Sequence, residues 1–280
     1  MKETGQPILD FTGVSKRFAD GTLALEGFDL RVTEGEFVSV VGPSGCGKST
    51  LLRIVSGLTD ASAGTVAVHT NEMGYVFQDP TLLPWRTVQD NVELFGELRR
   101  MPKAERRRRA ADAIELVGLS DFVRHHPRAL SGGMRMRVSL ARTLTLRPEL
   151  FLFDEPFAAL DEISRERLND ELLQLYSTQG FSALFVTHSV TEAVFLSTRV
   201  VVMTGRPGRL RGDFAVPFDY PRSPQLRFDQ RFAKAAGEVS ACLRGLDQPL
   251  GAAREPGARR DGSQNSSPPA DVDPTRSVRR

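Results

Sequence analysis

The chain has 280 residues, of which 40% are hydrophobic and 26% charged, a balance typical of an ordinary folded protein and not of a fibrous or disordered one. Its formal net charge of +2 excludes a strongly basic protein, so any anionic partner has to be inferred from local features. The chain has only 2 cysteines, and one lies in a glycine-rich loop, which argues against a disulfide framework and indicates a reducing compartment.

The apolar segments indicate a chain that does not cross a membrane by itself. Residues 1–10 include Lys2, Glu3 and Asp10 and contain no apolar core of signal-peptide length. No later stretch approaches the ~20 apolar residues that a membrane-spanning helix needs. If the protein acts in transport, we expect other polypeptides to supply the pathway.

Apolar runs predict the strands of an α/β core. Residues 8–14 and 28–32 alternate apolar and polar side chains, as half-exposed strands do. Helix-length segments separate several later runs, so their order predicts a wound α/β fold. These runs are almost continuously apolar, as in strands covered on both faces of a parallel sheet, and comprise residues 37–41, 150–153, 183–187 and 200–203.

Strand signals disappear in the middle of the chain and helical patterns replace them, notably over residues 103–117 and 134–144, with breaks at Gly118 and Pro127. We interpret this region as a helical subdomain inserted into the α/β core. The C-terminal part first reads as helical and then becomes rich in Gly, Pro, Ser and Arg, which predicts a disordered tail. The expected organisation is a discontinuous core of residues 1–88 and 145–221, a helical subdomain of 89–144, a helical extension of 222–250 and a tail of 251–280.

A glycine-rich loop follows the first buried run and precedes the helix-like residues 50–56. It fits G-x-x-x-x-G-K-[ST], in which glycines let backbone N–H groups approach phosphate oxygens at a helix N-terminus. Lys48 supplies a cation for the β- and γ-phosphates, and Ser49 a hydroxyl for Mg²⁺. The alternative is a glycine-rich turn that only joins a strand to a helix. We predict an ATP-binding loop of Gly42, Pro43, Ser44, Gly45, Cys46, Gly47, Lys48, Ser49 and Thr50.

Two carboxylates, Asp154 and Glu155, end the apolar run 150–153. Strand carboxyl ends are where open α/β sheets bind ligands. We expect Asp154 to hold Mg²⁺ through water and Glu155 to polarise the water that attacks the γ-phosphate. An isolated acidic pair more often ends a strand by facing solvent, but the upstream phosphate loop favours the catalytic interpretation.

A third motif, Leu130-Ser131-Gly132-Gly133-Met134, precedes a helical pattern. Ser131 can cap that helix, and the free N–H groups of the helix and of the two glycines form a site for an anion. Ser-Gly-Gly alone is a common turn. Between a phosphate loop and an acidic pair, however, the motif resembles the signature of ABC ATPases, and the order of motifs matches that family over residues 8–209. The resemblance implies an α/β P-loop NTPase core with a parallel sheet, an N-terminal antiparallel β subdomain and an inserted helical subdomain.

The resemblance also implies roles for single residues. Phe18 stands where an aromatic side chain stacks on adenine, and Gln78 stands where a glutamine reaches Mg²⁺ and the attacking water. Asp161 stands in the loop that crosses the dimer interface, and His188 at the histidine that contacts the γ-phosphate. Glu155, His188 and Gln78 would then be catalytic. In this family the signature of one subunit closes on the ATP of the other, a role that falls on Ser131, Gly132, Gly133 and Met134.

Some of these assignments have alternatives. Phe18 could be a packed core aromatic and His188 a structural histidine. The segment Ser189-Val190-Thr191-Glu192 reads as a capping box, which would fix a helix start directly after His188. Met134 stands where many family members have Gln, and the subgroup with Ser-Gly-Gly-Met makes this departure ordinary. It leaves open how the signature contacts the ribose.

Two further segments resemble the ATPases of nitrate, sulfonate and taurine importers: Leu82-Leu83-Pro84-Trp85 and Gly205-Arg206-Pro207-Gly208-Arg209. In importers the first lies near the groove that receives a short helix of the membrane subunit; the alternative is that Trp85 is buried. The resemblance implies a second ATP-binding subunit, transmembrane permease subunits and, indirectly, an extracytoplasmic solute-binding protein. It implies a peripheral protein at the cytoplasmic face of the cell membrane.

Two rival functions remain open. An ABC ATPase that acts on nucleic acid or the ribosome would use the arginines 106–109 as a basic patch, but acidic residues flank them in a helical run, as on a solvated helix face. We therefore expect no nucleic-acid partner. A phosphotransferase would use the same phosphate loop and would not need the Ser-Gly-Gly signature.

Overall fold

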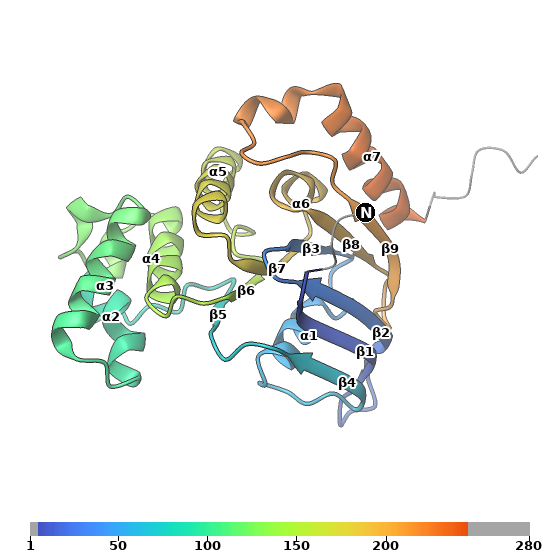
Figure 1. Ribbon diagram of the computed structural model, residues 1–280, viewed down its shortest axis with the longest axis horizontal. Coiled ribbons are helices and arrows are strands. Elements are labelled where there is room, and N and C mark those ends of the chain that lie inside the picture. Colours follow the sequence, from blue (N-terminus) through green and yellow to red (C-terminus); the bar gives the residue numbers. More distant parts are fainter. Residues whose placement is uncertain (1–4, 246–280) are drawn as a thin grey trace, which may run out of the picture. The chain divides into compact units, whose positions relative to one another are not determined.

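The computed structural model describes residues 5–245 and shows two β-sheets (Figure 1). The larger sheet has six strands in the order β5-β6-β7-β3-β8-β9, and neighbours are parallel except for β8 and β9. The smaller is antiparallel, with the order β2-β1-β4. The strands are β1 (Pro7–Arg17), β2 (Leu23–Thr33), β3 (Phe37–Val41), β4 (Ala63–Val68), β5 (Met73–Val76), β6 (Leu150–Asp154), β7 (Ser182–Thr187), β8 (Arg199–Met203) and β9 (Leu210–Ala215).

The central strands β3, β6 and β7 are buried along their whole length because both faces of the large sheet are covered. One face carries α5 (Glu162–Gln179), α6 (Val190–Leu196) and α7 (Gln230–Arg244). The other face packs against α1 (Lys48–Val55) and the small sheet. Alternate residues of each strand enter the two apolar clusters, which explains the continuous apolar runs in the sequence.

The structure contains three strands that the sequence analysis did not predict: β4, β5 and β9. β4 and β9 carry mostly exposed or half-exposed side chains, so they lack the apolar run that marks a buried strand. β5 has only 4 residues, one of them Gly74. Edge position and short length removed the sequence signal in these cases.

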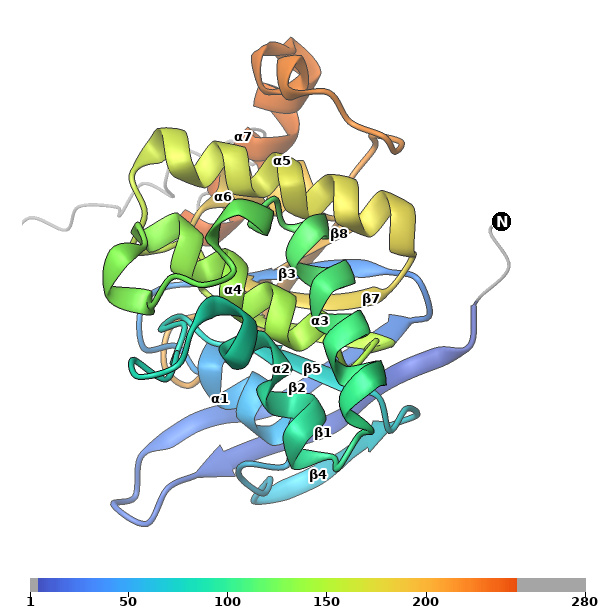
Figure 2. The same ribbon diagram turned by 90° about the vertical axis from the view of Figure 1, so that its left-hand side faces the viewer.

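Three helices, α2 (Val88–Leu98), α3 (Lys103–Leu116) and α4 (Gly132–Leu144), form an apolar cluster of their own (Figure 2). Two short 3-10 turns, Ser120–Phe122 and Pro127–Ala129, join α3 to α4. The side chain of Arg106 of α3 packs directly on α2 at Gly96, where an added Cβ would lie 2.8 Å from Cγ of Arg106. α4 also contacts β5 and α5, which attaches this cluster to the core.

The described C-terminal part contains a 3-10 turn (Pro224–Phe228) and α7. The predicted tail 251–280 and residues 246–250 lie outside the described residues. Within residues 5–245, no helix has the length and apolar character to cross a membrane.

Arg222, which the sequence analysis did not single out, fastens this C-terminal segment to α6. Its side chain is buried, and it donates to the carbonyl oxygens of Val194 at 3.0 Å, Phe195 at 2.7 Å and Ser197 at 3.0 Å. It also donates to the carbonyl of Phe218 at 2.7 Å. A guanidinium can satisfy several carbonyls at a helix C-terminus at once, where a positive charge is also favourable.

We predict that Arg222→Met destabilises the fold, because it leaves several buried carbonyls without donors. The free energy of unfolding should fall by about 2–4 kcal/mol, which corresponds to a melting temperature lower by roughly 5–15 °C. Thermal melting followed by circular dichroism measures this. The control is Arg231→Met, because Arg231 is exposed and pairs with Asp229 at the surface; it should melt like the wild type. Equal melting of both variants would contradict the proposed clamp.

Candidate nucleotide-binding site

The phosphate loop joins β3 to α1 and depends on its glycines. Gly45 has φ 73° and Gly47 φ 108°, backbone conformations that side chains with a Cβ rarely adopt. A Cβ at Gly47 would also lie 2.8 Å from Cδ2 of Leu25 and 2.9 Å from the carbonyl oxygen of Ala24. The loop therefore rests directly on β2.

Lys48 is buried at the start of α1 and folds back along the loop. Its Nζ donates to the carbonyl oxygens of Gly42 at 2.9 Å and Pro43 at 3.2 Å. It also lies 3.4 Å from Oε1 of Glu155. The one cation of the loop thus stands between the loop backbone and the acidic pair, where it can meet phosphate oxygens.

Asp154, at the end of β6, accepts hydrogen bonds from two hydroxyl groups. Ser49 Oγ donates to its Oδ1 at 2.7 Å, and the Tyr75 hydroxyl donates to its Oδ2 at 3.1 Å. Burial, and secondarily the charge of Asp154, raises the pKa of Tyr75, so its hydroxyl stays protonated and keeps donating. The structure therefore unites Ser49 and Asp154 as the sequence predicts, and adds Tyr75, which no motif marked.

Glu155 adopts a left-handed backbone conformation, with φ 46°. Such strain costs about 1–3 kcal/mol in a non-glycine residue and is concentrated at functional sites. Its N–H donates to the carbonyl of Val186 at 2.9 Å, and its Oε2 lies 3.2 Å from Nδ1 of His188. The strained turn thus aims one carboxylate at both Lys48 and His188, which combines three of the predicted site residues.

His188 follows β7 and precedes α6, as predicted, but the capping box is only half formed. Ser189 caps α6 by accepting from the N–H of Glu192 at 3.3 Å. The Glu192 carboxylate turns instead to the Thr187 hydroxyl, at 2.5 Å, and the N–H of Ser189 donates to that hydroxyl at 3.0 Å. In a complete capping box the Glu192 carboxylate would accept from the backbone N–H of Ser189, and here the buried Thr187 hydroxyl is its donor instead.

Burial raises the pKa of Glu192 above its ordinary value of 4.5, against the opposing effects of the Thr187 hydrogen bond and Arg165. The folded protein therefore binds this proton more tightly than the unfolded chain. The stability contributed by Glu192 is complete below its ordinary pKa and is lost as the pH rises through the raised value.

Glu192→Gln cannot ionise, so we predict that it melts at increasingly higher temperature relative to the wild type as the pH is raised from about 4 to about 7. Thermal melts across this range give the difference at each pH. Glu166→Gln, a substitution at an exposed position of α5, is the control and should show a constant difference. A constant difference for Glu192→Gln as well would contradict the sign of the pKa shift.

The signature motif begins α4, and Ser131 caps it by accepting from the N–H of Met134 at 3.3 Å. A Cβ at Gly132 would lie 3.2 Å from Cδ2 of Leu160, so the signature packs against the loop that holds Asp161. Asp161 is exposed and caps α5 by accepting from the N–H of Ser164 at 2.9 Å, a bond that lowers the pKa of its carboxyl.

The phosphate loop and the signature belong to different packing environments. α1 packs with β2, β4, β6 and β7, whereas α4 packs with α2, α3, β5 and α5. Phe18 lies in the turn between β1 and β2 with 40% of its surface exposed, which excludes the alternative of a core aromatic. Gln78 is exposed after β5. Both are open to a ligand or a partner.

The segment Gly205–Arg209 contacts the phosphate loop, which the sequence analysis missed because it treated the segment only as a mark of resemblance. Arg206 donates to the carbonyl of Gly45 through Nη2 at 3.2 Å. Gly208 N–H donates to the carbonyl of Ala24 at 2.8 Å, and a Cβ at Gly208 would lie 2.1 Å from the carbonyl oxygen of Cys46. This segment therefore holds the phosphate loop between itself and β2.

We predict that Gly208→Ala displaces the phosphate loop, because the clash at Cys46 is with backbone and no side-chain rotation relieves it. The kcat/KM for ATP should fall about 10- to 100-fold. The matched control is Gly205→Ala in the same segment, where an added Cβ meets nothing within 4 Å. Steady-state ATPase assays compare the two, and equal kinetics would show that the contact does not shape the site.

Three of the four arginines 106–109 form ion pairs with acidic side chains. Arg106 contacts Glu93 at 2.7 Å, Arg108 contacts Asp112 at 3.6 Å, and Arg109 contacts Glu105 at 2.6 Å. These ion pairs within α2 and α3 offset the charges of those three arginines, and only Arg107 of the run is exposed without an ion pair among the residues described here. The structure therefore gives no support to the interpretation of this run as a nucleic-acid surface.

The phosphate loop, the hydroxyl groups around Asp154 and the strained Glu155 meet at one edge of a parallel sheet, and this fold and site define a P-loop ATPase. A family model described as ABC transporter matches residues 25–158. The chain belongs to the ABC transporter family and is the ATP-hydrolysing subunit of a transporter of this family.

Similar proteins agree with this assignment. The aliphatic sulfonates import ATP-binding protein SsuB 1 of Pseudomonas syringae pv. syringae is 46% identical over 78% of this chain and 89% of its own. The nitrate import ATP-binding protein NrtD of Synechocystis sp. is 38% identical over 85% of this chain and 96% of its own. A dimeric ABC transporter cassette, MJ0796, superposes with a TM-score of 0.67 and 31% identity over 75% of this chain and 100% of its own. The predicted fold class is thereby confirmed.

Proposed function

We propose that this ATPase drives the import of a small solute of the nitrate, sulfonate or taurine kind through separate membrane subunits. The names of the sulfonate and nitrate relatives support import. The observation that carries the catalytic part is the contact of one carboxylate, that of Glu155, with both Lys48 and His188. The membrane location follows from this role: a peripheral protein at the cytoplasmic face of the cell membrane.

In the proposed mechanism Lys48 and the backbone of the phosphate loop hold the β- and γ-phosphates, and Phe18 stacks on adenine. Glu155 polarises the attacking water, while His188 and Gln78 hold the γ-phosphate and that water in place. The strain at Glu155 supports this role because it fixes the carboxylate before the substrate arrives.

The donor set around Asp154 fits Mg²⁺, which prefers hydroxyl, carboxylate and amide oxygens. Ser49, Asp154 and Gln78 would hold the ion. When bound with ATP, Mg²⁺ neutralises the charge that develops on the phosphates. Tyr75 donates to Asp154 and keeps its carboxylate oriented.

We further propose that two copies form the working unit, each supplying its signature (Ser131, Gly132, Gly133 and Met134) to the other's ATP, with Asp161 at the interface. The support is that the phosphate loop lies in the core and the signature on α4 in the helical cluster. This is the proposed division between a core of residues 1–88 and 145–221 and a helical subdomain of 89–144. ATP binding closes the pair, and hydrolysis reopens it.

The proposed permease contact is the segment Leu82 to Trp85. Trp85 is 71% exposed, which excludes the alternative that it is buried, and Leu82 packs against the helical cluster. Exposed aromatic side chains, Trp above all, are typical of residues that anchor a partner protein. An extracytoplasmic solute-binding protein would select the solute and deliver it to the permease.

ATP hydrolysis measured against protein concentration tests the composite site. The wild-type rate per chain should rise with concentration, and Glu155→Gln should lower kcat by about 10²- to 10⁴-fold. With Mg-ATP, that variant should accumulate as a dimer in light scattering. Glu166→Gln is the control and should behave as the wild type. A rate that is independent of concentration and survives Glu155→Gln would overturn the mechanism.

A further inference from the structure

The segment between Gln78 and α2 contains no helix or strand, yet two buried side chains from different helices hold it. Asn91 of α2 has 0% of its surface exposed, and Arg142 of α4 has 4%. Both side chains direct their polar atoms at backbone groups of residues 80–87. We call the segment 80–87 the Trp85 loop. A loop that is fixed in this way has a defined shape, although it lies between regular elements.

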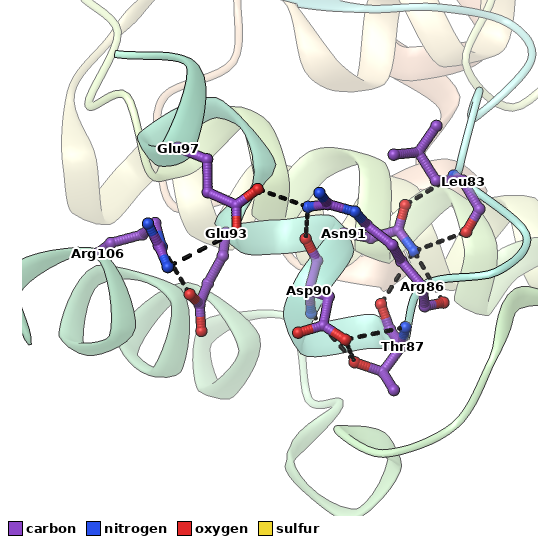
Figure 3. Close-up of polar contacts among 8 residues, drawn as sticks. All are labelled: Leu83, Arg86, Thr87, Asp90, Asn91, Glu93, Glu97 and Arg106. Carbon is purple, nitrogen blue, oxygen red and sulfur yellow. Dashed lines mark hydrogen bonds and ion pairs between the residues drawn. The ribbon is translucent and has the colours of Figure 1, made fainter. Parts of the chain in front are cut away.

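Asn91 binds the backbone of the Trp85 loop with both ends of its amide (Figure 3). Its Oδ1 accepts from the N–H of Leu83 at 2.8 Å, and its Nδ2 donates to the carbonyl of Leu83 at 3.1 Å. Nδ2 also donates to the carbonyls of Arg86 at 3.1 Å and Thr87 at 2.9 Å. A neutral amide presents a donor and an acceptor side by side, so neither Asp nor Leu can replace it here.

The two ends of the loop are fixed separately. Arg142 donates to the carbonyls of Pro80 at 2.9 Å and Thr81 at 3.1 Å. At the other end, Arg86 contacts Glu97 at 2.7 Å (Figure 3). Thr87 and Asp90 form a complete capping box at the start of α2. Only the stretch around Pro84 and Trp85 is left to project.

The arginines beside the loop form ion pairs within the chain. Arg86 and Arg106 both approach Glu97, and Arg106 also contacts Glu93, whose side chain is nearly buried. The projecting part is therefore an indole and a proline, which suit an apolar segment of a partner.

We propose that Asn91 is a positioning residue that holds Trp85 in the orientation in which it meets the membrane subunit. A side chain that is already ordered loses less conformational entropy on binding, so the affinity depends on Asn91 although Asn91 is buried and touches no partner. This inference rests on the proposed function for the identity of the partner. The ordering of Trp85 by Asn91 does not depend on the proposed function.

The ordering can be measured without any partner, because Trp85 is the 1 tryptophan of the chain. Time-resolved fluorescence anisotropy of the full chain should show little fast motion of the indole in the wild type. Asn91→Ala should increase the amplitude of that fast motion, and so should Asn91→Asp, which keeps the acceptor for the N–H of Leu83 but turns an oxygen toward three carbonyl groups. The control is Gln89→Ala, on the same helix, whose side-chain amide donates to Glu93 at 3.0 Å and not to the Trp85 loop.

Binding to a permease subunit from the same organism, held in lipid nanodiscs, completes the test as a double-mutant cycle. Asn91→Ala and Trp85→Ala should each raise the Kd about tenfold or more. The double variant should bind no more weakly than Trp85→Ala alone, because Asn91 acts through Trp85. ATP hydrolysis by the isolated chain should stay at the wild-type level in all three variants.

The outcomes separate the two proposals. Additive losses in the cycle, or wild-type anisotropy in a folded Asn91→Ala, overturn the role of Asn91. Failure of the wild type to bind the membrane subunit overturns the proposed partner, whatever the anisotropy shows. If Asn91→Ala does not fold, Asn91→Asp and the exposed Trp85→Ala carry the same cycle.

Discussion

The parallel pairing of β3, β7 and β6 is the constraint on which the site depends. In register, Val41 lies beside Thr187, and Asp154 lies beside Val186. Three strands from distant parts of the sequence therefore end at one level. The phosphate loop, the acidic pair and His188 each follow one of these ends, so the register of the sheet sets the distances between them. Burial of the strands on both faces makes that register hard to shift.

Much of the site could be predicted because its groups are required by local chemistry. The phosphate loop needs glycines at fixed positions, and Gly45 and Gly47 have the conformations that this implies. Ser131 precedes a helix and caps it, as a serine at that position does. Each of these residues is determined by neighbours a few positions away, and such relations are visible in a single sequence.

Other parts of the site depend on contacts between distant segments and could not be predicted. Tyr75 reaches Asp154 across two paired strands, and Arg206 reaches Gly45 from a loop far along the chain. Thr187 displaces the backbone as the partner of Glu192, which changes a local motif by tertiary packing. The same limit applies to β4 and β9, whose edge positions leave their side chains exposed or half-exposed, so neither strand needs a long apolar run. The strain at Glu155 likewise arises from its surroundings and has no sequence signal.

The Arg222 clamp changes how the boundaries of this protein should be understood. The motifs named from the sequence end with His188 and the segment Gly205–Arg209, so a minimal cassette drawn from motifs alone would stop after β9. Such a shortened chain would contain every residue that we propose to meet ATP. It would lack the guanidinium that closes the carbonyl end of α6, the helix that begins directly after His188. The unit that folds around the nucleotide site is thus longer than the unit that contains its chemistry.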